Sequence, residues 1–179
     1  MSVILTILSA WLLADFLSGL FHWYEDRLLI EPSRFKLIEQ IRIDNELHHV
    51  QPYAMTRLPW VDNIYQSVYV ASPVSLCLSL AGAPVVISLA ILFLGFANLV
   101  HRWAHIHPKK LNRFIRFMQS LGLFICFDHH NSHHFSEGTG RITKENSTSH
   151  YCVMTCWLNP ILDRIRFFKF LELIFMRRK

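Results

Sequence analysis

Charged residues are scarce in this sequence. Only 17% of its 179 residues are Asp, Glu, Lys or Arg, whereas soluble domains carry about 25%. Hydrophobic residues reach 52%, which is more apolar surface than a protein facing water on every side can accommodate. The composition therefore argues against a soluble domain.

Cysteines are also few. The chain has four, none of them in a CxxC pair, and this argues against a disulfide framework. Acidic residues number 13 against 18 Lys and Arg, for a net charge of +5. Because the basic residues flank long apolar runs, the excess charge indicates lipid headgroups and not nucleic acid as the partner.

Long apolar runs are present instead. Residues 3–23 form a run of about twenty, enough to cross ~30 Å of hydrocarbon as a helix. They lack a signal-peptide cleavage site, so we expect this span to remain. Residues 64–104 are interrupted by Ala-Gly-Ala-Pro at 81–84, which predicts a hairpin of two helices over 64–80 and 85–105. The sequence thus predicts an all-α integral membrane protein with about three transmembrane helices, in a single domain over residues 1–179.

Three further segments have their own character. Residues 114–127 are apolar but too short for a span, which favours an interfacial or re-entrant helix. Residues 135–149 are rich in Ser, Thr, Asn and Gly and indicate a loop. Residues 162–179 mix basic and apolar side chains, as in an amphipathic helix on a membrane surface.

The basic residues predict the topology. All 18 Lys and Arg lie within residues 27–57, 102–144 or 164–179, and none lies in the first span or in the hairpin. With the N-terminus outside, each of these segments is cytoplasmic, in agreement with the positive-inside rule. We therefore expect a multi-pass protein whose C-terminus is also cytoplasmic.

Histidine is the most over-represented residue, with 11 copies. Most of the histidines fall in clusters where residues four apart share a helical face, so that His129 would pair with His133 and His130 with His134. In the predicted topology every cluster reaches the cytoplasmic face of the membrane. The clusters are Asp15, Ser18, His22 and Asp26; His48 and His49; Asn98, His101 and His105; and His129, His130, His133 and His134.

This one-sided clustering predicts a metal centre. Neutral imidazole is the commonest protein ligand for several transition metals, and two imidazoles four residues apart can hold one ion. Nine imidazoles and a carboxylate exceed what one tetrahedral zinc can use, so two metals fit better. Iron is favoured where such ligands leave positions open for oxygen. Taken singly, each cluster could be an interfacial, solvated or metal-scavenging feature, but four coincidences on one face are improbable.

Some polar residues keep two interpretations. Asp15 lies within the first span, where a charge costs several kcal/mol unless it is paired. It either supports the metal site or binds a polar partner in the helical bundle. We interpret His107 as a residue at the level of the lipid headgroups. His150 is either an additional metal ligand from late in the chain or has no role in the site.

Other classes of membrane protein fit less well. A zinc hydrolase with an HExxH motif would need a glutamate after His101, where the chain has Arg102. A metal transporter would have acids in the middle of several spans, and residues 64–98 contain none. A haem protein would use two axial histidines and leave the others unexplained.

The clusters and their flanking residues resemble the membrane histidine-box lipid desaturases, the family that includes plasmanylethanolamine desaturase. The resemblance covers residues 14–172 in five ordered motifs. They are Ala14-Asp15-Phe16-x-Ser18-Gly19-x-x-His22-Trp23-x-x-Asp26; His48-His49-x-x-Pro52-x-x-x-Thr56-Arg57; Asn98-x-x-His101-x-Trp103-x-His105; His129-His130-x-x-His133-His134; and Tyr151-Cys152-x-x-Thr155-x-Trp157-Leu158-Asn159.

The resemblance implies a diiron centre that uses O₂ and two electrons to introduce a double bond into a lipid chain, in some members the vinyl ether bond of plasmalogens. It implies a supporting position for Asn98, whereas Asp15 and His150 are further candidates for supporting the metal site that the resemblance does not itself assign. It also implies an external electron donor of ferredoxin or cytochrome type, which we expect at the basic face. The implied metal ligands are His22, Asp26, His48, His49, His101, His105, His129, His130, His133 and His134.

Two points stay open at this stage. A lipid hydroxylase would use the same centre, and a non-enzymatic metal-binding membrane protein is a more distant alternative. The family also has a short histidine-containing link before the Tyr-Cys motif. This chain has instead the longer polar loop over residues 135–149, without a histidine at the matching place, and His150 is the candidate replacement for the last ligand.

Overall fold

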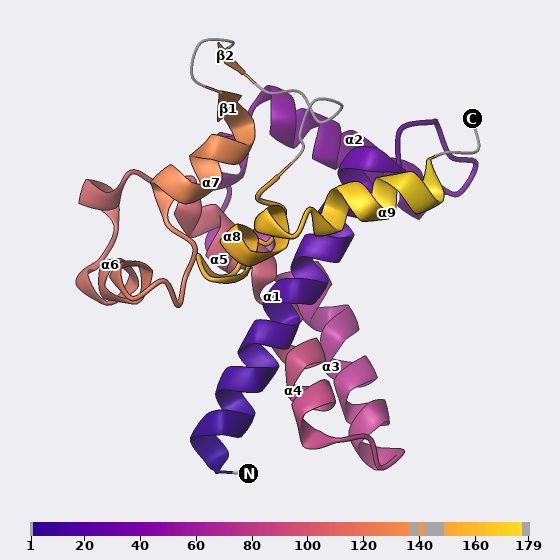
Figure 1. The fold of residues 1–179 in the computed structure, drawn as a ribbon, viewed down its shortest axis with the longest axis vertical. Helices are drawn as coiled ribbons and strands as arrows, with labels where there is room; N and C mark the ends of the chain where they lie inside the picture. Colours follow the sequence, from indigo (N-terminus) through magenta and orange to yellow (C-terminus); the bar gives the residue numbers. More distant parts are fainter. Residues whose placement is uncertain (1, 137–139, 142–148, 177–179) are drawn as a thin grey trace.

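The computed structural model describes residues 2–136, 140–141 and 149–176, and this part of the chain is almost entirely helical (Figure 1). Its only strands, β1 and β2, form a two-residue antiparallel ladder inside the predicted polar loop, the remainder of which lies outside the described residues. In chain order the elements are α1 (Val3–Arg27), α2 (Lys36–Val50), η1 (Ala54–Thr56), η2 (Trp60–Asn63), α3 (Tyr65–Leu80), α4 (Val85–Leu94), α5 (Ala97–Ala104), η3 (Pro108–Lys110), α6 (Arg113–Ser120), α7 (Phe127–His134), β1 (Phe135–Ser136), β2 (Gly140–Arg141), α8 (Leu158–Arg164) and α9 (Phe167–Phe175).

Helices α1, α3 and α4 form a narrow stem below a broader cap (Figure 1). Small residues lie at the contact between α1 and α4, where Ala10, Ala14 and Ala90 are fully buried. Small side chains let helix backbones approach closely. Within the hairpin, the Ser75 hydroxyl donates a hydrogen bond to the carbonyl of Ser88 at 2.7 Å. The stem is therefore held by close backbone packing and one buried polar contact.

One helix of the stem is clearly long and apolar enough to span a membrane. α1 has 25 residues and a mean hydropathy of 2.0 in its most apolar window, and the pair α4 and α5 passes the same test only as one span bent by 49°. α3 has 16 residues, about 24 Å at ~1.5 Å per residue, which is shorter than a ~30 Å core. A candidate membrane-spanning helix is thus present, and the count of three stays a prediction.

The helix expected over residues 85–105 is divided in two. α4 ends at Leu94 and α5 begins at Ala97 after a bend. Gly95 lies in the break, where a Cβ would be 3.0 Å from the Ala71 Cβ and 3.3 Å from the Val68 Cα. The absence of a side chain at Gly95 lets α3 pack against the backbone at this bend, after which α5 continues across the base of the cap.

An extended segment over residues 151–155, which precedes α8, is buried inside the cap. Its backbone amides are bound by side chains of α1, since Asp15 accepts hydrogen bonds from Met154 and Thr155 at 2.9 and 3.0 Å. Ser18 accepts another from Val153 at 3.2 Å. Buried amides need such partners where no strand or helix supplies them. Asp15 therefore has polar partners within the bundle, which is one of its two predicted roles.

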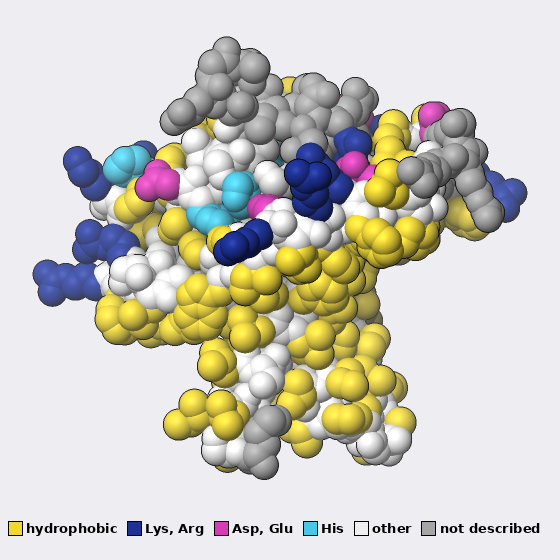
Figure 2. Space-filling model, viewed as in Figure 1, with side chains coloured by type: hydrophobic (Ala, Val, Ile, Leu, Met, Phe, Trp, Pro, Cys, Tyr) yellow, Lys and Arg dark blue, Asp and Glu magenta, His cyan; other side chains and the backbone are white. Residues whose placement is uncertain are grey.

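Apolar side chains cover the stem and the underside of the cap, whereas the basic side chains in this view lie on the cap (Figure 2). α6 contributes exposed Phe114 and Phe117, and α9 contributes exposed Phe170, Leu173 and Ile174. Exposed apolar faces of this kind are typical of helices that lie in a membrane interface. Helix α6 is shorter than the interfacial segment predicted over 114–127, and the segment predicted over 162–179 is divided between the end of α8 and α9, with residues 177–179 outside the described residues. That these helices lie in a membrane interface stays a prediction.

Gly19 marks the closest approach of α1 to the buried segment. A Cβ at this position would lie 2.6 Å from the Cys152 Sγ and 3.2 Å from the Cys152 amide nitrogen. We expect Gly19→Ala to lower the free energy of unfolding by ~1–3 kcal/mol, as overpacking does, in thermal unfolding of the detergent-solubilised protein. Adding Cys152→Ala should restore only part of the loss, because the backbone contact remains. A Gly19→Ala protein as stable as the parent would contradict this packing.

Candidate metal centre

Nine of the ten predicted ligands converge in two groups inside the cap. In each group, one potential donor atom from every residue lies within 4.8 Å of all the others. The five-histidine group takes residues from α2, from α5 and the residue that caps its C-terminal end, and from α7, and the aspartate group takes residues from α1, α2 and α7. The five-histidine group is His48, His101, His105, His130 and His134; the aspartate group is His22, Asp26, His49 and His133.

In the five-histidine group, several Nε2 atoms point at one another. The Nε2 of His101 lies 2.7 Å from that of His130 and 3.1 Å from that of His105, and the Nε2 atoms of His130 and His134 are 3.0 Å apart. Two nitrogens bound at ~2.1 Å to one ion, at right angles, are separated by about 3.0 Å. The spacing of these nitrogens therefore fits a shared metal ion.

Asp26 is the centre of the aspartate group and is fully buried. Its Oδ1 lies 3.0 Å from His49 Nε2, and its Oδ2 lies 3.4 Å from His133 Nε2 and 3.8 Å from His22 Nε2. A carboxylate with three imidazoles is a donor set typical of iron and zinc. The two groups adjoin, because the His49 and His134 ring centroids are 5.0 Å apart.

Backbone carbonyls orient two of these rings. His22 Nδ1 lies 3.0 Å from the carbonyl oxygen of Tyr151, and His133 Nδ1 lies 2.8 Å from that of Ser149. A carbonyl only accepts, so each Nδ1 carries the proton and each Nε2 is left with its lone pair toward Asp26. This is the usual arrangement behind a metal-binding histidine.

Buried donor atoms without partners also fit a metal. Among the described residues, His22 Nε2 and His48 Nε2 are shielded from solvent and form no hydrogen bond. Burial, with smaller contributions from neighbouring imidazoles, holds the pKa values of His48 and His130 well below the usual range. Both rings are therefore neutral near pH 7, which is the form that binds a metal ion.

His129 is the predicted ligand that the structure leaves outside both groups. Its Nε2 lies 3.0 Å from the side-chain nitrogen of Asn159, which donates, and its ring lies 4.8 Å from that of His150. Burial and the nearby His150 lower the pKa of His129 to about 4. The spacing that was expected to pair His129 with His133 therefore does not bring them together, whereas His130 and His134 do share a group.

The supporting residues predicted from the sequence lie elsewhere. Asn98 is exposed on α5, and no hydrogen bond among the described residues joins it to a histidine. His150 adopts a positive φ of 60° and lies 3.5 Å from a carboxylate oxygen of Asp163. Asp15 binds the extended segment, as described above. His107, set aside in the sequence, is exposed.

Sequence reasoning missed Asn45, whose side-chain amide donates to Asp26 Oδ1 at 2.9 Å. Its signal was the spacing of four residues to His49, which places both on the face of α2 that meets Asp26. The carbonyls of Ser149 and Tyr151 were also missed. Sequence carries no signal for a carbonyl, because every residue has one.

The fold and the site together define a class: a helical protein with a candidate membrane-spanning helix and two adjoining buried groups of histidines that could each hold a metal ion. A profile of the lipid desaturase domain matches residues 11–179. The chain belongs to the lipid desaturase family.

Curated relatives agree with this membership. The chain is 29% identical to a plasmanylethanolamine desaturase of Myxococcus xanthus, with 90% of this chain and 56% of the relative covered. It is 29% identical to plasmanylethanolamine desaturase 1 of Mus musculus, covering 95% and 64%, and 27% identical to a chloroplastic fatty acid desaturase 4-like protein of Arabidopsis thaliana, covering 93% and 57%. The chain therefore spans somewhat more than half the length of these relatives. No solved structure matches it.

Proposed function

We propose that this protein is an O₂-dependent lipid desaturase with two iron ions, one in the five-histidine group and one in the aspartate group. The observation that supports this most strongly is the pair of adjoining, buried donor sets, of five and four residues. One metal would leave half of these donors unused. A desaturase needs an oxidant because the hydrogens of a lipid chain are not acidic enough for an ordinary base.

The centre supplies the oxidising chemistry when iron is bound, since side chains provide acids, bases and nucleophiles but no such oxidant. The protein's own residues do the rest. Neutral imidazoles present their Nε2 atoms, the carbonyls of Ser149 and Tyr151 hold two rings in orientation, and Asn45 fixes Asp26. Burial of these groups keeps bulk water away from the reacting atoms.

The setting suits a lipid substrate. The apolar stem would lie in the bilayer, with the N-terminus outside and the cap at the cytoplasmic interface, where the basic residues lie. Two of the relatives are plasmanylethanolamine desaturases by name, and formation of a vinyl ether bond is the reaction we propose first for this protein. An acidic ferredoxin or cytochrome would deliver electrons to the basic cap.

Metal and lipid analysis tests this function. We expect about two irons per chain in the purified protein, and an unsaturated or vinyl ether lipid in cells that express it. The same cells with His133→Ala should lack that lipid, because the aspartate group loses an imidazole. Stoichiometric zinc without iron in the purified protein, or a lipid profile that His133→Ala leaves unchanged, would contradict the proposal. A product carrying an added hydroxyl group would instead identify a hydroxylase.

A further inference from the structure

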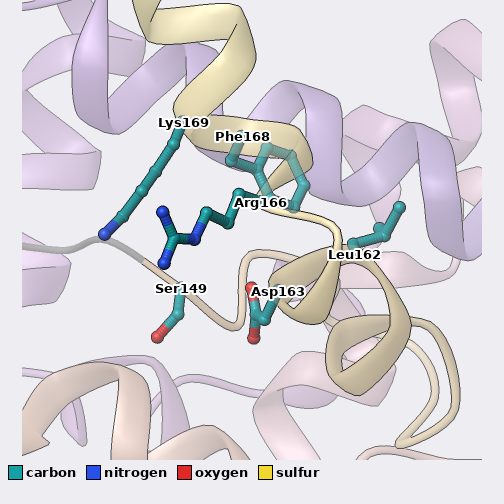
Figure 3. Close-up of a pocket in the computed structure, with 6 residues that line it drawn as sticks. All are labelled: Ser149, Leu162, Asp163, Arg166, Phe168 and Lys169. Carbon is teal, nitrogen blue, oxygen red and sulfur yellow. The ribbon is translucent and has the colours of Figure 1, made fainter.

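A pocket opens in the cap where α8 meets α9 (Figure 3). Its volume is about 170 Å³, which is small beside pockets that enclose whole ligands, at about 300–1,000 Å³. It therefore suits one polar group and not an entire lipid. The lining residues are Ser149, Leu162, Asp163, Arg166, Phe168 and Lys169.

Arg166 and Lys169 are cations without a counter-charge among the described residues, since neither forms an ion pair or a side-chain hydrogen bond there. Their nitrogen-bearing ends extend to the side of the pocket where Ser149 lies (Figure 3). By contrast, Arg27 on the neighbouring helix is paired with Glu172 at 2.9 Å. Two cations at one pocket that have no acidic partner among the described residues favour an anion, and phosphate is one of the anions that arginine and lysine bind well.

The backbone at Arg166 is unusual. Its φ and ψ of 55° and 36° lie in the left-handed region, which glycine adopts easily and arginine only at a cost. The chain carries arginine there, at the turn that joins α8 to α9. An energetically costly conformation at a pocket points to a use for the side chain.

Asp163 adds a negative charge to the same pocket. Its carboxylate lies 3.5 Å from His150 Nε2 and would repel a free phosphate dianion. A zwitterion avoids this repulsion, because its phosphate can lie at the two cations and its ammonium at the carboxylate. The charge pattern thus favours a headgroup with both signs.

The polar pocket continues into an apolar groove along α9. The groove has a volume of about 720 Å³ and shares Arg166 and Lys169 with the pocket. Its apolar wall includes Ile165, Phe170 and Leu173, which are 64%, 58% and 50% exposed. A charged pocket that adjoins an exposed apolar groove is complementary to an amphiphile, with the polar end in the pocket and the apolar chains along the groove.

The pocket also lies beside the metal centre. Ser149 lines it, and the carbonyl of Ser149 accepts the hydrogen bond from His133 in the aspartate group. A lipid anchored here would therefore lie next to the centre, where a substrate must lie.

We propose that this pocket binds the headgroup of a zwitterionic glycerophospholipid, with the phosphate between Arg166 and Lys169, the ammonium at Asp163 and the chains along the groove of α9. The inference rests on the proposed function, because it places the lipid substrate at the metal centre. It adds a binding site to that function.

Native mass spectrometry of the full-length protein with short-chain phosphatidylethanolamine tests the site. We expect Arg166→Gln with Lys169→Gln to weaken binding by about a hundredfold or more, because the phosphate loses both of its charged partners. Arg164→Gln with Lys110→Gln removes the same charge from exposed positions outside the pocket and should leave binding unchanged. Asp163→Asn should abolish the preference for phosphatidylethanolamine over phosphatidylglycerol.

Several outcomes would overturn the inference. The first is an equal loss of lipid binding in the control variant. The second is competition by inorganic phosphate that is as effective as competition by the lipid. The third is a double variant that binds lipid normally but is no longer reduced by an acidic ferredoxin. Iron content is measured on the same samples. Normal iron with unchanged lipid binding in the double variant would reject the site but keep the proposed function, whereas iron-free parent protein would reject the function alone.

Discussion

Asp26→Asn is expected to reduce the iron content from about two ions per chain to about one. It should also lower the rate of desaturation by at least ~100-fold. Asp26 is the only carboxylate in either donor group. Asparagine has nearly the same shape, but it is uncharged and its amide nitrogen has no lone pair for a metal. The five-histidine group contains no part of Asp26, so its ion should remain.

Metal analysis and product formation measure this effect together. Asp44→Asn is the matched control, because Asp44 is exposed on α2 and, within the described part of the chain, accepts a hydrogen bond from Gln40 alone. This control should retain both irons and full activity. If Asp26→Asn also keeps both irons and its activity, Asp26 is no ligand and the aspartate group consists of three imidazoles.

Asp15→Ala should be the most destabilising single change outside the metal centre. Asp15 is fully buried and accepts hydrogen bonds from two amides and from the Thr155 hydroxyl at 2.5 Å. Alanine leaves these donors buried without an acceptor, at ~1–3 kcal/mol each, so we expect a loss of roughly 3–5 kcal/mol and a thermal midpoint lower by about 10 °C. Thermal unfolding in detergent measures both.

Asp15→Asn separates the hydrogen bonds from the charge. The Oδ1 of asparagine can still accept from Met154 and Thr155, and its amide can donate to the Thr155 hydroxyl oxygen after that hydroxyl rotates. We therefore expect Asp15→Asn to cost much less than Asp15→Ala. Equal losses would show that the negative charge itself holds the segment, and a stable Asp15→Ala protein would contradict the contact.

Much of the candidate site could be predicted from residue type and spacing. Pairs four residues apart on one helix, such as His101 with His105 and His22 with Asp26, do lie in one group each, because about 3.6 residues make a helical turn. Histidines that are adjacent in the sequence lie in different groups for the same reason. His48 and His49 lie in different groups, since successive side chains point about 100° apart.

The helical character and the first span were also predictable, because hydropathy and helix length are local properties. The bend between α4 and α5 was not. It depends on Gly95 lying against α3, a contact between helices that the apolar pattern of residues 85–105 does not contain. The role of His129 was equally hidden, since Asn159 binds it from a part of the chain 30 residues away.

The sequence by itself determined that this chain is apolar, helical and rich in histidines at helical spacings, because composition and periodicity are local properties of the chain. Only the tertiary structure decided which donors lie together in one group. Each group combines side chains from three helices, and their alignment depends on how α1, α2, α5 and α7 pack. That packing also set His129 apart and brought Asn45 and two backbone carbonyls to the centre.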